Sequence, residues 1–358
     1  MIKRTANDRG SRSGTVSPPP VDRKSVARRM ALLGALTAAL LVGTVTVETR
    51  RWVGATFPGF FVLANRVVPS IALPEWTVDA DSGLFQQEIV AVDGVSVDTQ
   101  EAVYARVAGK PAGTPITYTV RATDGQTSAI QVRSRRFSAA DYFYLFGAYL
   151  LNGTVFMLIG LLAFWLRPRN ADSAGLLSLG LTTGLFVVTA ADIYGAHWFF
   201  RVHVVAESLL APSFLHLALV FPVDRIRRRR RAILRAVYLP FVALAVVYEV
   251  VLGSPSGYTA VHLAATATHA VGAAALIAAV LHGLLRGGSP LVRRTVAIVA
   301  MGAVAAFLSP MVCWAASAML GGQVALNSAA LTAFLFPLTL GYAIVQSNPS
   351  PKTDLAAR

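Results

Sequence analysis

A series of seven apolar segments occupies the chain from Tyr142 to its last residues and limits what the chain can fold into. The segments lie at residues 142–166, 174–195, 202–222, 236–252, 260–285, 295–319 and 326–346. Each is near the ~20 residues that an α-helix needs to cross a hydrocarbon core. Only 14% of all residues are charged, against about 25% in soluble proteins. The pattern predicts one compact bundle of membrane-spanning helices.

The N-terminal region adds an eighth predicted span. Residues 1–30 contain eight Lys or Arg and a Pro triplet, a composition that predicts a disordered basic tail. An uncharged apolar run then fills most of residues 31–48. It resembles the core of a signal peptide, but no Ala-x-Ala type cleavage site follows. We interpret residues 31–48 as an uncleaved transmembrane anchor.

Residues 49–141 differ from the rest of the chain. They hold nine basic and nine acidic residues, and turn signals such as Asp93-Gly94 and Asp124-Gly125 separate short apolar runs. Residues 116–120 alternate apolar and polar side chains, as a half-buried strand does. This region predicts one small β-rich domain between the anchor and the bundle.

The basic residues predict the orientation of the chain in the membrane. The loop from Arg225 to Arg235 holds seven Arg and no acidic residue. Arg201 is the one basic residue in the loops 195–201, 253–259 and 320–325, whereas further basic segments contain Arg167, Arg169, Arg286, Arg293, Arg294, Lys352 and Arg358. Eight crossings place all of these basic segments in the cytoplasm together with both termini, so residues 347–358 form a cytoplasmic tail and the β-rich domain lies outside.

The net charge of +14 therefore has a topological explanation. Nucleic-acid binding is not expected. The run Arg227–Arg231 is instead expected to attract anionic lipid headgroups.

Part of the β-rich region resembles a PDZ domain. Residues 83–94 match the Gly-Leu step that leads through a strand into an Asp-Gly turn, although Gln87-Glu88 replaces the usual Gly-Asp. Upstream, Gly59, Phe60, Phe61 and Val62 are similar to a carboxylate-binding loop. The resemblance implies that these residues hold a peptide C-terminus and that a following strand takes the peptide as an added strand. The alternative is a spacer domain without a ligand.

The apolar segments carry a second resemblance, in residues 214–222 and 336–345. They include four residues of the family motif: His216, Phe221, Pro222 and Pro337. With an anchor, an outer PDZ-like domain and seven further spans, residues 30–346 look like the input half of bacterial sensor histidine kinases of the ComP-like quorum-sensing type.

This second resemblance has consequences for function and partners. It implies a sensor in the bacterial cytoplasmic membrane that acts on a separate cytoplasmic kinase or response regulator, because only thirteen residues follow Val345 and no kinase domain is included. A homodimer is compatible with this scheme, and the ligand is expected to be a peptide or a lipophilic molecule.

Ionisable residues in the predicted outer halves of the spans are candidates for a ligand or coupling pocket, because such groups are costly in a membrane. The candidates are Asp192, His203, Glu207, Glu249, His262 and His269. His203 and Glu207 are one helical turn apart and share a face, as do His262 and His269. The alternative is that these residues only reach water at the membrane edge.

Enzymatic activity is not expected from the sequence. It has no His-Glu-x-x-His motif, no Gly-rich phosphate loop and one cysteine, Cys313, so no metal or other cofactor is predicted. The leading hypothesis is a membrane module that senses a cue and relays it to a separate partner. The alternatives are a small-solute transporter or channel, and a non-catalytic envelope adaptor that acts through the PDZ-like domain.

Overall fold

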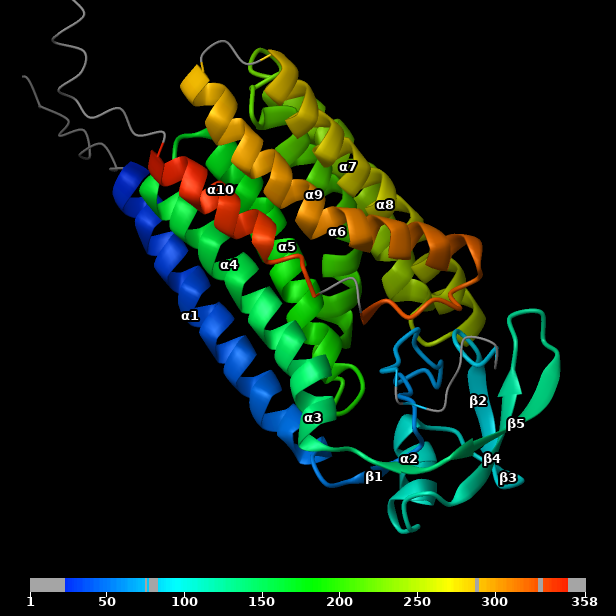
Figure 1. Ribbon diagram of the computed structural model, residues 1–358. Helices are drawn as coiled ribbons and strands as arrows, with labels where there is room; N and C mark the ends of the chain where they lie inside the picture. Colours follow the sequence, from blue (N-terminus) through cyan, green and yellow to red (C-terminus); the bar gives the residue numbers. More distant parts are fainter. Residues whose placement is uncertain (1–22, 75, 77–82, 287–289, 328–330, 347–358) are drawn as a thin grey trace, which may run out of the picture.

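Helices dominate the structure, a computed structural model that describes residues 23–74, 76, 83–286, 290–327 and 331–346. A long helical bundle carries a small β domain at one end (Figure 1). The helices of the bundle are α1 (Arg23–Thr49), α3 (Ala139–Tyr142), α4 (Ala148–Leu166), α5 (Ala171–Asp192), α6 (Phe200–Val220), α7 (Arg230–Val251), α8 (Pro255–Arg286), α9 (Pro290–Met319) and α10 (Leu335–Gln346). A short π-helical stretch, Phe143–Gly147, joins α3 to α4 without a break.

Seven helices in the described part of the chain are long and apolar enough to cross a membrane. They are α1, the continuous helix from Ala139 to Leu166, and α5 to α9. The prediction of a helical multi-pass membrane protein with a small β-rich domain is therefore confirmed.

The eighth predicted span, at residues 326–346, does not form a full-length helix. Only α10, with 12 residues, is helical there, and at 1.5 Å per residue it extends about 18 Å, short of a ~30 Å hydrocarbon core. Residues 320–327 take an irregular path, because Gly321 and Gly322 have positive φ angles of 60° and 85°. Hydrogen bonds then hold this segment against the β domain.

The predicted basic tail also differs from the structure at one end. Residues 23–30 were expected to be disordered, but they form the first two turns of α1. No Pro or Gly interrupts this stretch, and the guanidinium of Arg28 lies 6.0 Å from the centre of the Trp165 ring on α4. The helix therefore begins before the apolar run does. The predicted tails at residues 1–22 and 347–358 lie outside the described residues.

Six helices of the bundle form a closed ring. In order around the ring, α4 packs on α5, α5 on α6, α6 on α8, α8 on α9, α9 on α10 and α10 on α4. One large apolar core lies inside this ring and includes Phe156, Leu217, Leu276 and Phe336. Helices α1 and α7 lie on the periphery, and the apolar parts of their surfaces are largely exposed, as expected for lipid-facing helices.

Glycines let α4 and α5 approach each other closely. A Cβ atom on Gly180 would lie 2.6 Å from the carbonyl oxygen of Phe156, and one on Gly184 would lie 2.8 Å from the carbonyl oxygen of Gly153. Small residues at such crossings allow backbone contact between membrane helices. The pair forms one wall of the ring.

The β domain contains two small antiparallel sheets. Its elements are β1 (Thr56–Phe57), β2 (Glu88–Val92), β3 (Val95–Ser96), α2 (Gln100–Ala108), β4 (Pro115–Arg121), β5 (Thr127–Arg133) and β6 (Arg135–Arg136). The strand order is β3-β2-β4-β5 in one sheet and β1-β6 in the other. Ile116, Tyr118 and Val120 of β4 are fully buried, as their alternation predicted.

Aromatic side chains dock the β domain on the bundle. Phe61 stacks on Tyr194, which follows α5, with ring centres 4.7 Å apart and planes at 13°. It also stacks on Phe146, with ring centres 5.7 Å apart. Such pairs contribute about 0.5–1.5 kcal/mol each beyond the apolar area that they bury. The domain is thus fixed on the bundle by its own core residues.

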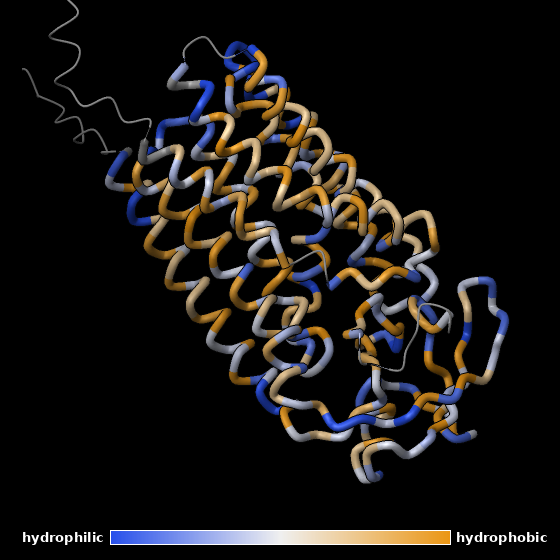
Figure 2. Tube along the Cα trace, in the orientation of Figure 1, coloured by the Kyte–Doolittle hydropathy of each residue, from blue (hydrophilic) through white to orange (hydrophobic). Residues whose placement is uncertain are grey.

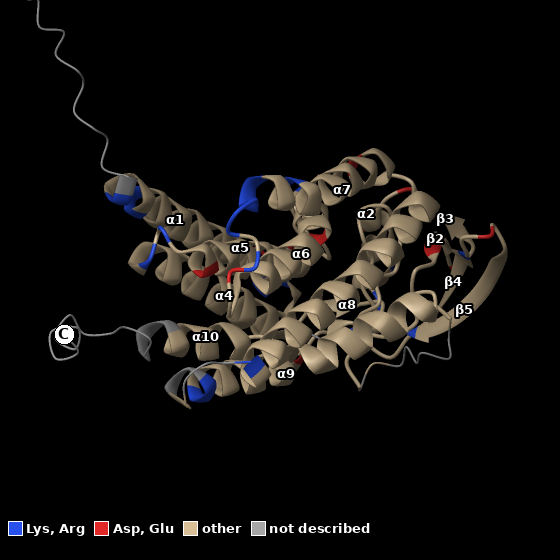
Figure 3. Ribbon diagram, turned by 90° about the horizontal axis from the view of Figure 1, so that it is seen from above, with Lys and Arg blue, Asp and Glu red and all other residues tan. Residues whose placement is uncertain are grey.

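The two ends of the bundle differ in charge. Apolar residues dominate the helices between the ends (Figure 2). Lys and Arg gather where α1, α7 and α9 begin, at the end away from the β domain (Figure 3). We call this the basic end, and we call the other the domain end. Helix α10 finishes near the beginning of α1, at the basic end (Figure 1).

Candidate functional site

Four of the six predicted pocket residues meet inside the bundle, near the domain end. His203 and Glu207 come from α6, and His262 and His269 come from α8. Nδ1 of His262 lies 2.8 Å from Oε1 of Glu207. Nε2 of His269 lies 2.8 Å from the backbone oxygen of Glu207. We call these four residues the Glu207 cluster.

Residues of α5 hold the His203 side chain in place. Its Nδ1 lies 3.1 Å from the hydroxyl of Thr189 and 3.1 Å from the backbone oxygen of Phe186. The Phe186 ring stacks on the His203 ring, with centres 4.7 Å apart. Three helices therefore position the cluster.

Glu207 is fully buried, and its carboxylate has no Lys or Arg partner among the described residues. The described groups that face it include three histidines, and a histidine neutralises a carboxylate only when it is protonated. Although His262 is at hydrogen-bond distance, neither carboxylate oxygen has a well-aligned hydrogen bond within the described part of the chain. An unpaired charge in this position is costly, and a proton shared between Glu207 and a histidine offsets that cost.

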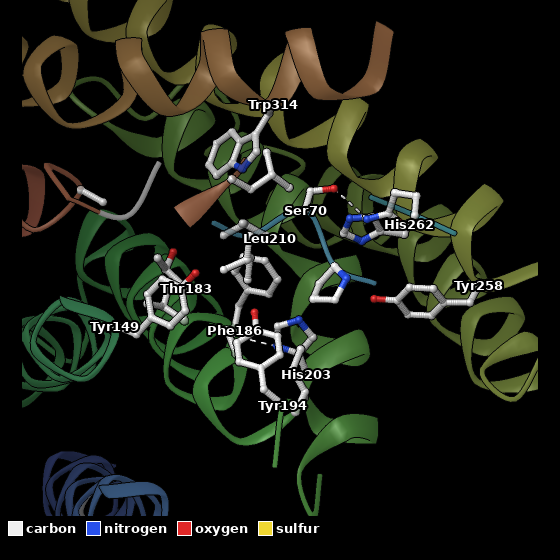
Figure 4. A pocket seen from close by; sticks show the side chains of 18 of the residues that line it. Ser70, Tyr149, Thr183, Phe186, Tyr194, His203, Leu210, Tyr258, His262 and Trp314 are labelled. Atoms are coloured by element: carbon white, nitrogen blue, oxygen red, sulfur yellow. Dashed lines mark hydrogen bonds between the residues drawn. The ribbon is translucent and has the colours of Figure 1, made fainter. Parts of the chain in front are cut away.

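A cavity of about 100 Å³ lies beside the cluster. Side chains from α4, α5, α6, α8 and α9 point into it, and Ser70 reaches it from the β domain (Figure 4). Leu326 and Ala333, from the segment before α10, complete the wall. His203 and His262 belong both to the cavity wall and to the Glu207 cluster. The cavity is thus built jointly by the β domain and the bundle.

Three residues connect the β domain to the segment before α10. The side-chain amide of Gln86 donates to the Ser70 hydroxyl at 2.8 Å, and that hydroxyl donates to the backbone oxygen of Gly322. The backbone N–H of Leu326 donates to the backbone oxygen of Ser70 at 2.7 Å. Gln86 has a positive φ of 61°, which is uncommon for a residue with a Cβ. We call Ser70, Gln86 and Gly322 the junction.

A second, polar pocket of about 390 Å³ lies on the other side of Gln86. Its walls include Arg66, Arg121 and Glu88 of the β domain and Ser256 at the start of α8. Glu88 pairs with both arginines, with 3.2 Å between its carboxylate and Arg121. Gln86 lines both pockets, so its side chain separates the polar pocket from the inner cavity.

Asp192 and Glu249 do not join the cluster. Asp192 accepts a hydrogen bond of 2.8 Å from the backbone N–H of Phe199, which fixes the turn between α5 and α6. Glu249 is partly exposed on α7 and lies 3.9 Å from Arg201. Both residues are at the predicted depth, but each faces its own local partner.

The predicted peptide-binding loop is built into the core. Phe60, Phe61 and Val62 are fully buried, and a Cβ on Gly59 would lie 3.0 Å from the backbone oxygen of Arg133. The strand predicted to follow the loop is not formed. Val62 is held by hydrogen bonds from α2 instead, and further along the described residues only Val67 forms an isolated antiparallel bridge, with Glu88 of β2.

The backbone N–H and C=O groups of Val62 form hydrogen bonds with side chains of α2. The Val62 N–H donates to the Tyr104 hydroxyl at 2.9 Å, and the Val62 oxygen accepts from Gln100 at 2.5 Å. Burial raises the pKa of Tyr104 above its ordinary value, so its hydroxyl keeps its proton. An added peptide strand would have to displace these bonds.

Three of the four residues of the second resemblance lie toward the basic end, where α6 ends. Nδ1 of His216 lies 3.2 Å from the Tyr238 hydroxyl. Pro222 contacts α8 so closely that a Cβ on Gly283 would lie 2.1 Å from its ring. Phe221 packs against the ring core, and Pro337 is in the first turn of α10. Of the run Arg227–Arg231, all but Arg230 are exposed.

Sequence reasoning missed the aromatic residues around the cluster. Tyr258 stacks on His262 with ring centres 5.7 Å apart, and Tyr248 of α7 contacts Glu207. Trp314 of α9 lies 5.4 Å from His269, measured between ring centres. Of these aromatic residues, only Tyr258 could have been linked to the cluster from the sequence, because it lies four residues before His262 and shares its helix face.

Comparisons of the chain with known protein families, with curated proteins and with solved structures gave no match.

Proposed function

We propose that the protein is a membrane receptor that binds a small ligand in the inner cavity and relays the event to a separate cytoplasmic kinase or response regulator. In this proposal the membrane is the bacterial cytoplasmic membrane, the β domain is outside, and the basic end is in the cytoplasm. The resemblance to the input half of ComP-like sensor kinases supports this reading, as does the concentration of Arg at the basic end.

One observation supports the proposal most strongly. The cavity walls come from two separate parts of the chain, the β domain and the helical ring. A ligand that fills the cavity therefore contacts both parts at once. If the ligand binds one arrangement of the two parts more tightly than another, it shifts their equilibrium. Helices that start at the cavity and end among the arginines carry this shift to the cytoplasmic face.

The Glu207 cluster is the expected coupling element within the bundle. Glu207 connects α6 to α8 through His262 and His269, and both helices extend toward the basic end (Figure 1). A change in the proton or ligand at the cluster alters the attraction between these helices. The contact of Pro222 with Gly283 then transmits their relative movement to the arginine loop.

The test compares two carboxylate substitutions in the native host. Glu207→Gln keeps the side-chain shape and removes the charge, and Glu249→Gln makes the same change outside the cavity. We expect both variants to reach wild-type abundance in the membrane. Glu207→Gln should change the expression of a defined set of genes by several-fold in a transcriptome measurement, whereas Glu249→Gln should not.

A transport function gives the opposite result. If the protein is a transporter, the Glu207→Gln variant should lose solute uptake in proteoliposomes. Gene expression should then change only as lack of the solute itself would change it. Identical transcriptomes for wild type and Glu207→Gln would refute the receptor proposal.

A further inference from the structure

The walls of the inner cavity combine many aromatic rings with no formal charge. Among the described residues, seven aromatic side chains line it, and no Lys, Arg, Asp or Glu does. The aromatic residues are Tyr149, Phe186, Tyr194, Phe214, Tyr258, Phe307 and Trp314. Faces of aromatic rings carry partial negative charge and attract cations. The absence of lysine and arginine from the wall removes the groups that would repel a cation.

A carboxylate lies directly behind the wall of the cavity. Glu207 lies behind two wall residues, since Nδ1 of His262 is 2.8 Å from its carboxylate and His203 is one turn away on the same helix. Its carboxylate oxygens lack a well-aligned hydrogen bond among the described residues. The site therefore has one buried negative charge whose balancing positive charge is mobile.

The groups that face Glu207 come from three helices. His203 lies on its own helix, His262 and His269 on α8, and Tyr248 on α7. None of these groups carries a permanent positive charge. At neutral pH, either a proton on a histidine or a cation in the cavity must balance Glu207.

From this arrangement, and resting on the receptor function proposed above, we infer that the ligand is a small organic cation with apolar substituents, such as a quaternary ammonium compound. The apolar groups of the cation fill the aromatic cavity. Its positive charge is attracted by the aromatic rings and by Glu207, which lies behind the imidazole rings of His203 and His262. When the cation enters, the shared proton leaves the cluster. An anionic ligand is disfavoured, because Glu207 repels it and no wall residue compensates.

The experiment uses choline and dimethylbutanol, in which carbon replaces the quaternary nitrogen of choline. The two probes have nearly the same shape and differ in charge. Binding is measured by isothermal titration calorimetry on the full-length protein in detergent. We expect choline to bind about tenfold or more tightly than dimethylbutanol. Choline binding should weaken on going from about pH 8 to about pH 5, because protonated histidines oppose the cation.

Variants locate the effect. Glu207→Gln should lower the affinity for choline about tenfold and leave that for dimethylbutanol unchanged. Trp314→Leu should weaken choline binding several-fold through the loss of a ring. Glu249→Gln, which removes a carboxylate paired with Arg201 outside the cavity, should change neither affinity.

Two outcomes would overturn the assignment. Equal or tighter binding of dimethylbutanol would show that the cavity takes neutral lipophilic molecules, and no binding of either probe would show that it does not take small cations. Neither outcome decides the receptor function, which is judged separately by the transcriptional response to Glu207→Gln.

Discussion

Asp93 shows how a single residue stabilises the β domain. It has a positive φ of 48° and precedes Gly94, with φ of 76°, in the turn between β2 and β3. Its carboxylate binds Lys110 and accepts the backbone N–H of Thr117 at 2.9 Å. These two contacts, the lysine first, lower the pKa of Asp93 below its ordinary value of 3.8. Because the pKa is lower in the folded state, the contacts stabilise the fold at neutral pH and stop doing so as pH falls through the lowered pKa.

Asp93→Asn tests this contribution. Asparagine tolerates the positive φ and still accepts the Thr117 N–H, but it loses the charge. We expect hydrogen exchange of residues 88–97 to be faster in the variant at pH 7, by a few-fold, since exposed ion pairs contribute at most about 1 kcal/mol. Wild type and variant should exchange equally once pH is well below the pKa of Asp93.

A matched control exists in the next hairpin. Asp124 occupies the turn between β4 and β5 and accepts the Gln126 N–H at 2.9 Å, but it forms no ion pair among the described residues. Asp124→Asn should not change exchange of residues 88–97 at either pH. A pH-independent difference for Asp93→Asn would mean that turn geometry, and not charge, is responsible.

At the scale of elements, the segment between α9 and α10 decides how the β domain sits on the bundle. Gly322 faces Gln86 so closely that a Cβ would lie 2.2 Å from its side chain. Nearby, Gln323 donates to the backbone oxygen of Phe85 at 2.7 Å. This segment takes the place of the outer half of a membrane-spanning helix. Its backbone polar groups form hydrogen bonds with the β domain, because such groups need partners where water is absent.

Gly322→Ala should therefore loosen the junction. The new methyl group displaces Gln86, and overpacking of this kind typically costs about 1–3 kcal/mol. Gly321→Ala is the control, because Gly321 also has a positive φ but a Cβ there would meet nothing within 4 Å. We expect a lower thermal unfolding temperature and faster proteolysis of the β domain for Gly322→Ala than for Gly321→Ala. Equal effects would show that only the backbone conformation matters.

For the whole molecule, the main prediction is its orientation. On a Cys313→Ala background, a cysteine at exposed Ser128 of β5 should react with an impermeant maleimide added outside intact cells. A cysteine at exposed Arg228 should react only after the cells are opened. Labelling of position 228 from outside would reverse the topology and with it the direction of signalling.

The sequence alone determined the features that depend on local composition. Runs of about 20 apolar residues predicted seven of the long helices, although α1 begins eight residues before its predicted start. The reason is that the need to satisfy backbone hydrogen bonds in lipid leaves a helix as the only conformation for such a run. Turn residues and alternation predicted the β domain in the same way. Helical periodicity also placed His203 with Glu207, and His262 with His269, on common faces.

Only the tertiary structure decided which of these faces meet. Asp192 and Glu249 have the right depth for the cavity, yet their helices turn them toward Phe199 and Arg201. The last predicted span is apolar enough to be a helix, but its first residue, Leu326, donates to the backbone oxygen of Ser70, and Gln323 just before it donates to Phe85. Such contacts join residues some 240 or more positions apart, and local sequence carries no information about them. The cavity depends on these contacts, so it exists only once the β domain and the ring have packed together.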